Sequence, residues 1–151
     1  MEIYRLFREK YGNPLSGKGA AIKGGRWNSK GFELVYTAAN RCLSMAEVAV
    51  HFSLGTMPDG YSMAVLYLPE DISMQIVNRE ALPPFWNHFP HVKSTQVIGD
   101  RFITENKFCV LKVPSVVVQN EYNLLLNPAH REFQRIKVIH TAPFKFDKRL
   151  F

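Results

Sequence analysis

The stretch GGRWNSKGFELVYTAANRCLSMAEVA, residues 24–49, decides the fold because it orders a loop, a strand and a helix. Three glycines mark the loop, and the segment ELVYTA, residues 33–38, predicts a strand. The helix is expected to begin with a cap at Asn40 and to end at Gly55. The loop precedes a strand instead of opening a helix, which argues against both the phosphate loop and the dinucleotide fold of the G-x-G-x-x-G type.

Outside this stretch, strand-like runs outnumber helical ones. That mixture predicts an α+β fold, a single domain over residues 1–151 with a mixed, largely antiparallel sheet and few helices. A doubly wound parallel sheet does not fit. The predicted elements are a strand or helix start at 3–7, a long loop at 8–32, strands at 61–69, 73–78, 108–113, 115–119 and 135–140, an irregular segment at 82–91, a helix at 94–105 weakened by Gly99, and an extended edge segment at 142–151.

Size and charge limit the classes of protein. The chain has 151 residues, 46% of them hydrophobic, and a net charge of +6. A basic surface suits a polyanion, an acidic protein or a phosphate-bearing ligand. No run of about 18 apolar residues predicts a membrane span, and the first residues do not resemble a signal peptide, so a cytoplasmic location is expected. Cys42 and Cys109 are expected to be buried small hydrophobic residues without a disulfide.

Three side chains at spacings of ten and eleven residues could form one site. Arg26 offers planar donors beside glycines that let a phosphate approach closely. Tyr36 ends the first clear strand, and Glu47 is the only acid in the helix that follows. Plainer interpretations stay open: a surface arginine in a tight turn, a core tyrosine, and an ion pair between Glu47 and Arg5 or Arg26. Together the three suit a dinucleotide such as NAD.

Other residues give weaker signals. Ser115 follows Pro114 at a break between two strand-like runs. His88 and His91 lie in a proline-rich loop without a metal-ligand pattern, so no metal is predicted. The basic surface leaves an RNA-binding module as an alternative function, although the charges are dispersed and no nucleic-acid partner is expected.

Seven segments together resemble the RES domain family, the toxin half of RES–Xre toxin–antitoxin pairs. The family is named for an arginine, a glutamate and a serine, which match Arg26, Glu47 and Ser115. The resemblance covers nearly the whole chain, through YRLF, LSGKGAAIKGGRWNSKG, LVYTAANRCLSMAEVAVH, TQVIGDRF, VLKVPSVVV, EYNLLLNPAH and PFKFDKRL.

The resemblance implies an ADP-ribosyltransferase-like fold that acts on NAD. Arg26 would hold the phosphates or ribose, Tyr36 would pack on the nicotinamide end, and Glu47 would stabilise the ribosyl cation. Ser115 would support the pocket by hydrogen bonding. The remaining NAD-binding residues would be Arg5, Gly25, Trp27 and Asn28, whereas Asn123, Asn127 and His130 would serve the pocket wall or the fold. Phe102 and Arg131 depart from the family pattern at its periphery.

The implied function is a toxin that cleaves NAD at the nicotinamide–ribose bond, as a glycohydrolase or phosphorylase, and so depletes NAD and arrests growth. Water, inorganic phosphate and a protein side chain are all candidate acceptors. The alternative is a mono-ADP-ribosyltransferase that modifies a cellular protein. An Xre-type DNA-binding antitoxin is the implied partner.

Overall fold

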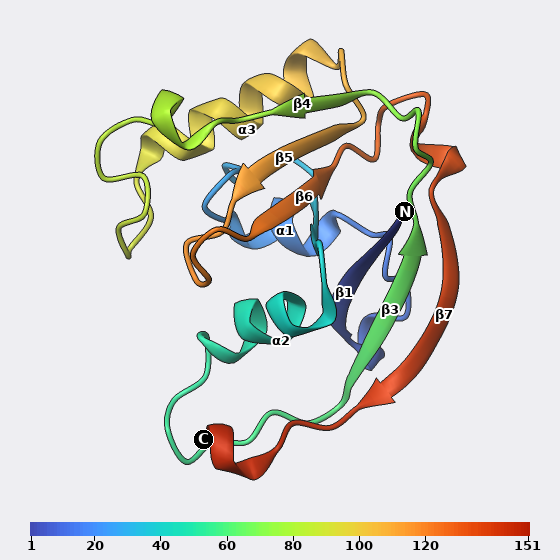
Figure 1. Cartoon of the computed structure of the whole chain (residues 1–151), viewed down its shortest axis with the longest axis vertical. Helices are drawn as coiled ribbons and strands as arrows, with labels where there is room; N and C mark the ends of the chain where they lie inside the picture. Colours follow the sequence, from blue (N-terminus) through green and yellow to red (C-terminus); the bar gives the residue numbers. More distant parts are fainter.

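One mixed sheet of seven strands organises the chain, in the order β4-β5-β6-β2-β1-β3-β7 (Figure 1). Only β4 and β5 are parallel, and every other neighbouring pair is antiparallel. The computed structural model describes residues 1–151. Its strands are β1 Glu2–Arg8, β2 Val35–Ala38, β3 Tyr61–Tyr67, β4 Met74–Ile76, β5 Val110–Pro114, β6 Tyr122–Leu126 and β7 Lys137–Phe144, and its α-helices are α1 Lys18–Lys23, α2 Arg41–Ala49 and α3 Lys93–Glu105. The predicted α+β class and largely antiparallel sheet are confirmed.

The sheet has two halves that meet between β1 and β2. These strands share a single register pair, Tyr4 with Ala38, whereas β1 pairs with β3 over its whole length. Figure 1 shows β4, β5 and β6 in the upper part of the molecule and β1, β3 and β7 along the right side. Helix α2 lies in the angle between the two groups. The first turn of this helix is therefore next to the junction of the halves.

Side-chain alternation along the strands divides the core into clusters. In β6, Leu124 and Leu126 belong to one buried cluster, and Leu125 between them belongs to a second cluster with Trp27 and Phe102. A third cluster, around Leu6, packs against α2 and the C-terminal aromatic residues. The second and third clusters cover adjacent parts of the same face. Tyr36, which packs on the second cluster, lies two residues before Ala38 and so on the same face of β2, and Ala38 is the register partner of Tyr4, which packs on the third cluster. The candidate site lies between these two clusters.

Most predicted elements are present, but four predictions are wrong. The long loop at 8–32 contains α1, which the six glycines of that segment obscured. Helix α2 begins as predicted, with the Asn40 side chain accepting a hydrogen bond from the Leu43 amide at 2.8 Å, yet it ends at Ala49 and not at Gly55. Cys109 is buried as expected, whereas Cys42 is exposed because it lies on the outer side of the first turn of α2.

The fourth error concerns residues 115–119, which form bends and turns instead of a strand. The hydroxyl of Ser115 accepts hydrogen bonds from the amides of Val117 and Val118, at 3.0 and 3.1 Å, and this bends the chain away from the sheet. The partner strand of β5 is β6, which starts only at Tyr122.

No helix in the chain has the length and apolar character needed to cross a bilayer.

Candidate active site

Glu47 is held on α2 by two neutral donors. Its Oε1 accepts a hydrogen bond from the Ser115 hydroxyl at 2.8 Å and another from the Asn123 side-chain amide at 2.6 Å. Neither Arg5 nor Arg26 forms an ion pair with it, so the structural ion-pair interpretation is wrong. Its Oε2 has no protein partner, and since no buried side-chain oxygen or nitrogen lacks a partner, this atom faces solvent. The carboxylate is fixed on one side and open on the other.

Ser115 uses all of its hydrogen-bonding capacity within the protein. The hydroxyl donates to Glu47 and accepts from two backbone amides, which fills its one donor and two acceptor positions. Its side chain is buried, directly after the last residue of β5. Ser115 therefore orients the carboxylate and has no atom left for a ligand.

The guanidinium of Arg26 is likewise bonded to the protein through only one of its nitrogen atoms. Its Nη1 donates to the carbonyl oxygens of Trp86 at 2.7 Å and His88 at 2.8 Å. The Nε and Nη2 atoms have no protein partner and face solvent, by the same reasoning as for Glu47. These two atoms form one edge of the guanidinium, the geometry that binds a phosphate through two parallel hydrogen bonds. The structure thus leaves one edge of the Arg26 guanidinium open at the glycine loop.

The loop around Arg26 is built on Tyr36 and Asn28. The Tyr36 hydroxyl donates to Asn28 Oδ1 at 2.7 Å and accepts from the Trp27 amide at 3.2 Å. Burial raises the pKa of this hydroxyl well above its usual range. A Cβ on Gly25 would lie 2.6 Å from the Tyr36 oxygen, so only glycine fits there.

The buried side chains of Asn28 and Trp27 stabilise the loop. The Asn28 side-chain amide donates to the carbonyl oxygens of Ala20, Ser29 and Phe32, and the side chain is fully buried. Trp27 is buried in the second cluster and anchors the loop to the core. Both residues were predicted to bind NAD, and the structure places their side chains behind the loop surface that carries Arg26.

Helix α3 holds the other side of the loop through two residues that were not among the predicted site residues. Gln96 donates to the carbonyl oxygens of Gly25 and Asn28, at 3.0 and 3.1 Å. Asp100 accepts from the Ser29 amide at 2.8 Å and from the Ser29 hydroxyl at 2.6 Å. The spacing of four residues puts Gln96 and Asp100 on one helical face. This spacing within the segment TQVIGDRF is the feature of the sequence that could have identified Gln96 and Asp100.

The charges of the site influence one another without direct contact. Burial lowers the pKa of Arg26, and the nearby carboxylate of Glu47 and the Tyr36 hydroxyl act in the opposite direction. An anion can therefore bind the open edge of Arg26 while a developing cation meets the open oxygen of Glu47. A substrate with a diphosphate and an adjacent centre that becomes positively charged matches this pair.

Arg5 is not brought to the other predicted residues. It follows Tyr4 and precedes Leu6, which both pack on the α2 side of β1, so its side chain lies on the opposite face. There Nη1 donates to the carbonyl oxygens of Pro14 and Ser16, at 2.6 and 2.9 Å. Burial lowers the pKa of Arg5 to about 10. Its observed contacts hold the segment that leads into α1.

The two asparagines of the C-terminal segment have separate roles. Asn123, at the start of β6, binds Glu47 directly, whereas Asn127, just beyond its end, bonds to Asn106 and to the Ala129 amide. His130 accepts from the Glu132 amide in the turn that follows. Asn127 and His130 therefore support the fold. Phe102, one of the family departures, lies buried behind Trp27, and Arg131 is exposed.

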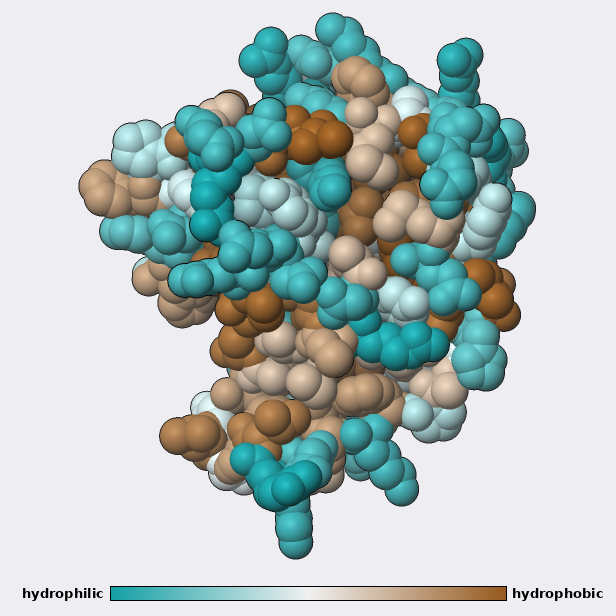
Figure 2. Space-filling model, in the orientation of Figure 1, coloured by the Kyte–Doolittle hydropathy of each residue, from teal (hydrophilic) through white to brown (hydrophobic).

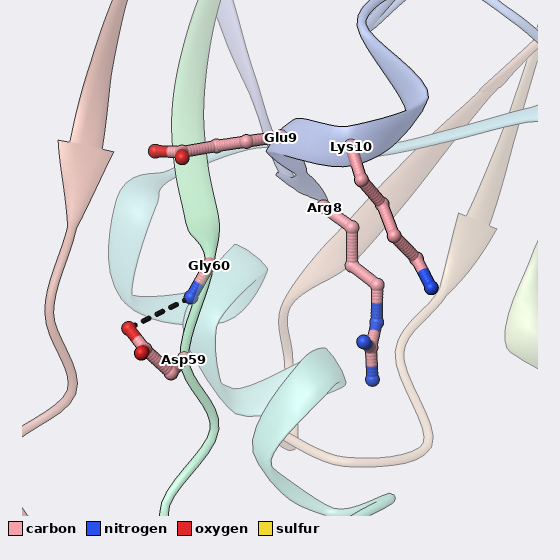
Figure 3. A pocket seen from close by; sticks show the side chains of 5 residues that line it. All are labelled: Arg8, Glu9, Lys10, Asp59 and Gly60. Carbon is pink, nitrogen blue, oxygen red and sulfur yellow. Dashed lines mark hydrogen bonds between the residues drawn. The ribbon is translucent and has the colours of Figure 1, made fainter.

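Two pockets lie away from this site. One, of about 360 Å³, is lined by charged residues and Gly60, with the Arg8 and Lys10 side chains on one side and Glu9 directed away from them (Figure 3). The other lies at Gly31–Glu33 and Asn127–Ala129.

No group of three His, Cys, Asp or Glu side chains is arranged to hold a metal ion. Figure 2 shows hydrophobic residues gathered over α2 and below it, beside an indentation in the left outline.

The model of the RES domain family matches residues 2–147. The chain belongs to this family. The match covers the whole site, from the glycine loop to β6, so Arg26, Glu47 and Ser115 all lie within it. The predicted family is confirmed.

Curated relatives of this RES domain are named as toxins. A protein of Yersinia enterocolitica named Toxin Res is 32% identical, over 99% of this chain and 99% of its own. A protein of Sphingobium sp. named Prs ADP-ribosylating toxin is 34% identical, over 90% of this chain and 86% of its own. Among solved structures, the M. tuberculosis MbcT–MbcA toxin–antitoxin complex matches with a TM-score of 0.76 and 19% identity, over 95% of this chain and 84% of that one. The protein is thus a toxin with the RES fold.

Proposed function

We propose that this RES domain binds NAD and cleaves its nicotinamide–ribose bond. The observation that carries the proposal is Glu47, a carboxylate held by neutral donors with one oxygen open. An acid without a bound cation keeps its full negative charge for the substrate. Toxicity would follow from loss of NAD and arrest of growth, with an antitoxin of the Xre type as the partner that restrains it.

The chemistry of bond cleavage fits the two open groups. The bond between the nicotinamide nitrogen and ribose C1′ breaks, and its electron pair leaves with neutral nicotinamide. The positive charge that develops on the ribose resembles that of glycoside cleavage, and the open oxygen of Glu47 stabilises it more in the transition state than in the substrate. Arg26 holds the diphosphate through Nε and Nη2. Water or inorganic phosphate then bonds to C1′, and the proton that water loses passes to solvent.

Substitution of Glu47 tests the proposal. Glu47→Gln keeps the shape of the side chain and removes its charge, so nicotinamide release from NAD should fall by about a hundredfold or more. The matched control is Glu33→Gln, which neutralises an exposed glutamate beside β2 and should leave the rate unchanged. Thermal unfolding of both variants shows whether they are folded. Equal rates in folded Glu47→Gln and wild-type protein would contradict the proposal.

Transfer of ADP-ribose to a protein is a second candidate, favoured by the name of the Sphingobium relative. It uses the same bond cleavage and differs only in the acceptor. Incubation of a cell lysate with labelled NAD, followed by mass spectrometry, distinguishes the two. Free ADP-ribose or its 1″-phosphate indicates water or phosphate as acceptor, and a protein that stably carries ADP-ribose indicates transfer.

A further inference from the structure

Residues 85–89, the sequence FWNHF, form a short aromatic arm beside the glycine loop. Phe85 is 63% exposed and Phe89 is 83% exposed, unusual values for phenylalanine. The His88 ring lies against Phe85, with ring centroids 4.7 Å apart and planes tilted by 57°. Pro83, Pro84 and Pro90 flank the arm and restrict its backbone. The arm thus presents aromatic faces to solvent on a constrained segment.

The arm is attached directly to Arg26. The carbonyl oxygens of Trp86 and His88 take both hydrogens of Arg26 Nη1, as described above. Trp86 itself packs against the second cluster, and the Arg79 guanidinium lies over its ring at 5.8 Å. Each exposed phenylalanine is adjacent in sequence to a residue whose carbonyl binds Arg26. The arm therefore lies within reach of whatever binds the open edge of that guanidinium.

We propose that the aromatic arm is the stacking platform for the adenine ring of the substrate, an inference that rests on the proposed function. NAD carries one nucleoside on each side of its diphosphate. Glu47 takes the nicotinamide ribose, so a diphosphate on Arg26 directs the other nucleoside away from Glu47. The arm is the exposed aromatic segment bonded to Arg26, and purine rings stack on exposed aromatic side chains. The arm then selects dinucleotides over mononucleotides.

The test compares NAD with nicotinamide mononucleotide, which has the scissile bond but no adenine. In the double variant Phe85→Ala/Phe89→Ala, the KM for NAD should rise about tenfold or more with kcat nearly unchanged, because stacking is lost in both ground and transition states. Cleavage of nicotinamide mononucleotide should be the same in variant and wild type. Phe89→Trp, which retains an aromatic face, should keep a KM near the wild-type value.

Tyr11→Ala is the matched control, since Tyr11 is an aromatic side chain, 67% exposed, outside the site. It should leave the KM for NAD unchanged. An unchanged KM for NAD in the double variant would overturn the arm's role while leaving NAD cleavage intact. A wild-type protein that releases nicotinamide from neither substrate would overturn the proposed function itself, and the arm proposal with it.

Discussion

Glu47 and Arg26 are each bonded to the protein through one part of the charged group and open through the other. Neither neutralises the other, because their partners are a hydroxyl, a side-chain amide and two backbone carbonyls. Fixed groups of this kind need no reorganisation when substrate binds. The hydrogen-bond partners of these two charged groups, and Ser115 above all, therefore determine how the groups are oriented.

Ser115→Ala should lower nicotinamide release by about tenfold to a hundredfold. The change leaves Glu47 with one donor and leaves the amides of Val117 and Val118 without their acceptor, at a cost to stability of about 1–3 kcal/mol. Single-turnover rates and urea unfolding measure the two effects. Ser53→Ala, at an exposed serine, is the control and should alter neither. A full rate in folded Ser115→Ala would show that Asn123 alone orients Glu47.

The residues of the proposed site can be selected from the sequence, whereas most of the residues that hold them cannot. Arg26, Tyr36 and Glu47 lie within 22 positions, and the strand and helix between them can be predicted locally. Gln96 and Ser115, in contrast, contact residues about 70 positions away in the chain. Such contacts depend on the order of strands in the sheet, which local periodicity does not contain. The same limit explains why Arg5 was grouped with the site although it lies on the opposite face of β1.

Helix α3 is the element that shapes the glycine loop. Its face carries Gln96, Gly99 and Asp100, and Gly99 lies so close to Trp27 that a Cβ there would be 1.5 Å from the Trp27 carbonyl oxygen. Gly99 weakened the helix prediction because glycine has low helical propensity. The close packing of helix and loop outweighs that loss. Residues 115–119 show the opposite case, since a β-branched run was diverted from a strand by one serine hydroxyl.

Gly99→Ala should strongly destabilise the protein, by about 3 kcal/mol or more, because either α3 or the loop must move. Gly19→Ala is the matched control: Gly19 also lies in a helix, and a Cβ there meets nothing within 4 Å. That substitution should stabilise the protein by up to about 1 kcal/mol. Urea unfolding midpoints measure both. Similar stability for the two variants would contradict the packing described for α3.

At the scale of the whole molecule, the C-terminal segment is tied back to the start of β4. The Glu132 carboxylate accepts hydrogen bonds from the amide and hydroxyl of Ser73 and from Arg135. These contacts, with Ser73 the largest, lower the pKa of Glu132 in the folded protein. A lowered folded-state pKa contributes stability above the usual glutamate range, and this contribution is lost as the pH falls through the lowered value.

Glu132→Gln should therefore lower stability at pH 7 and reduce the further loss on acidification. Urea unfolding between about pH 7 and pH 3 follows both changes, since this range spans the usual glutamate titration. Glu80→Gln is the control, because the Glu80 side chain is exposed. Its stability should follow that of the wild type at every pH. Parallel pH curves for Glu132→Gln and wild-type protein would refute the assignment.

The hydrogen bond from Asn123 to Glu47 also has a consequence during translation. Glu47 is synthesised 76 residues before its last donor, Asn123. The chain leaves the ribosome N-terminus first, and a domain generally folds as a unit. A nascent chain that has not yet exposed β6 lacks the Asn123 donor, so under the proposed function NAD cleavage is expected only after β6 has been made and has folded onto the sheet.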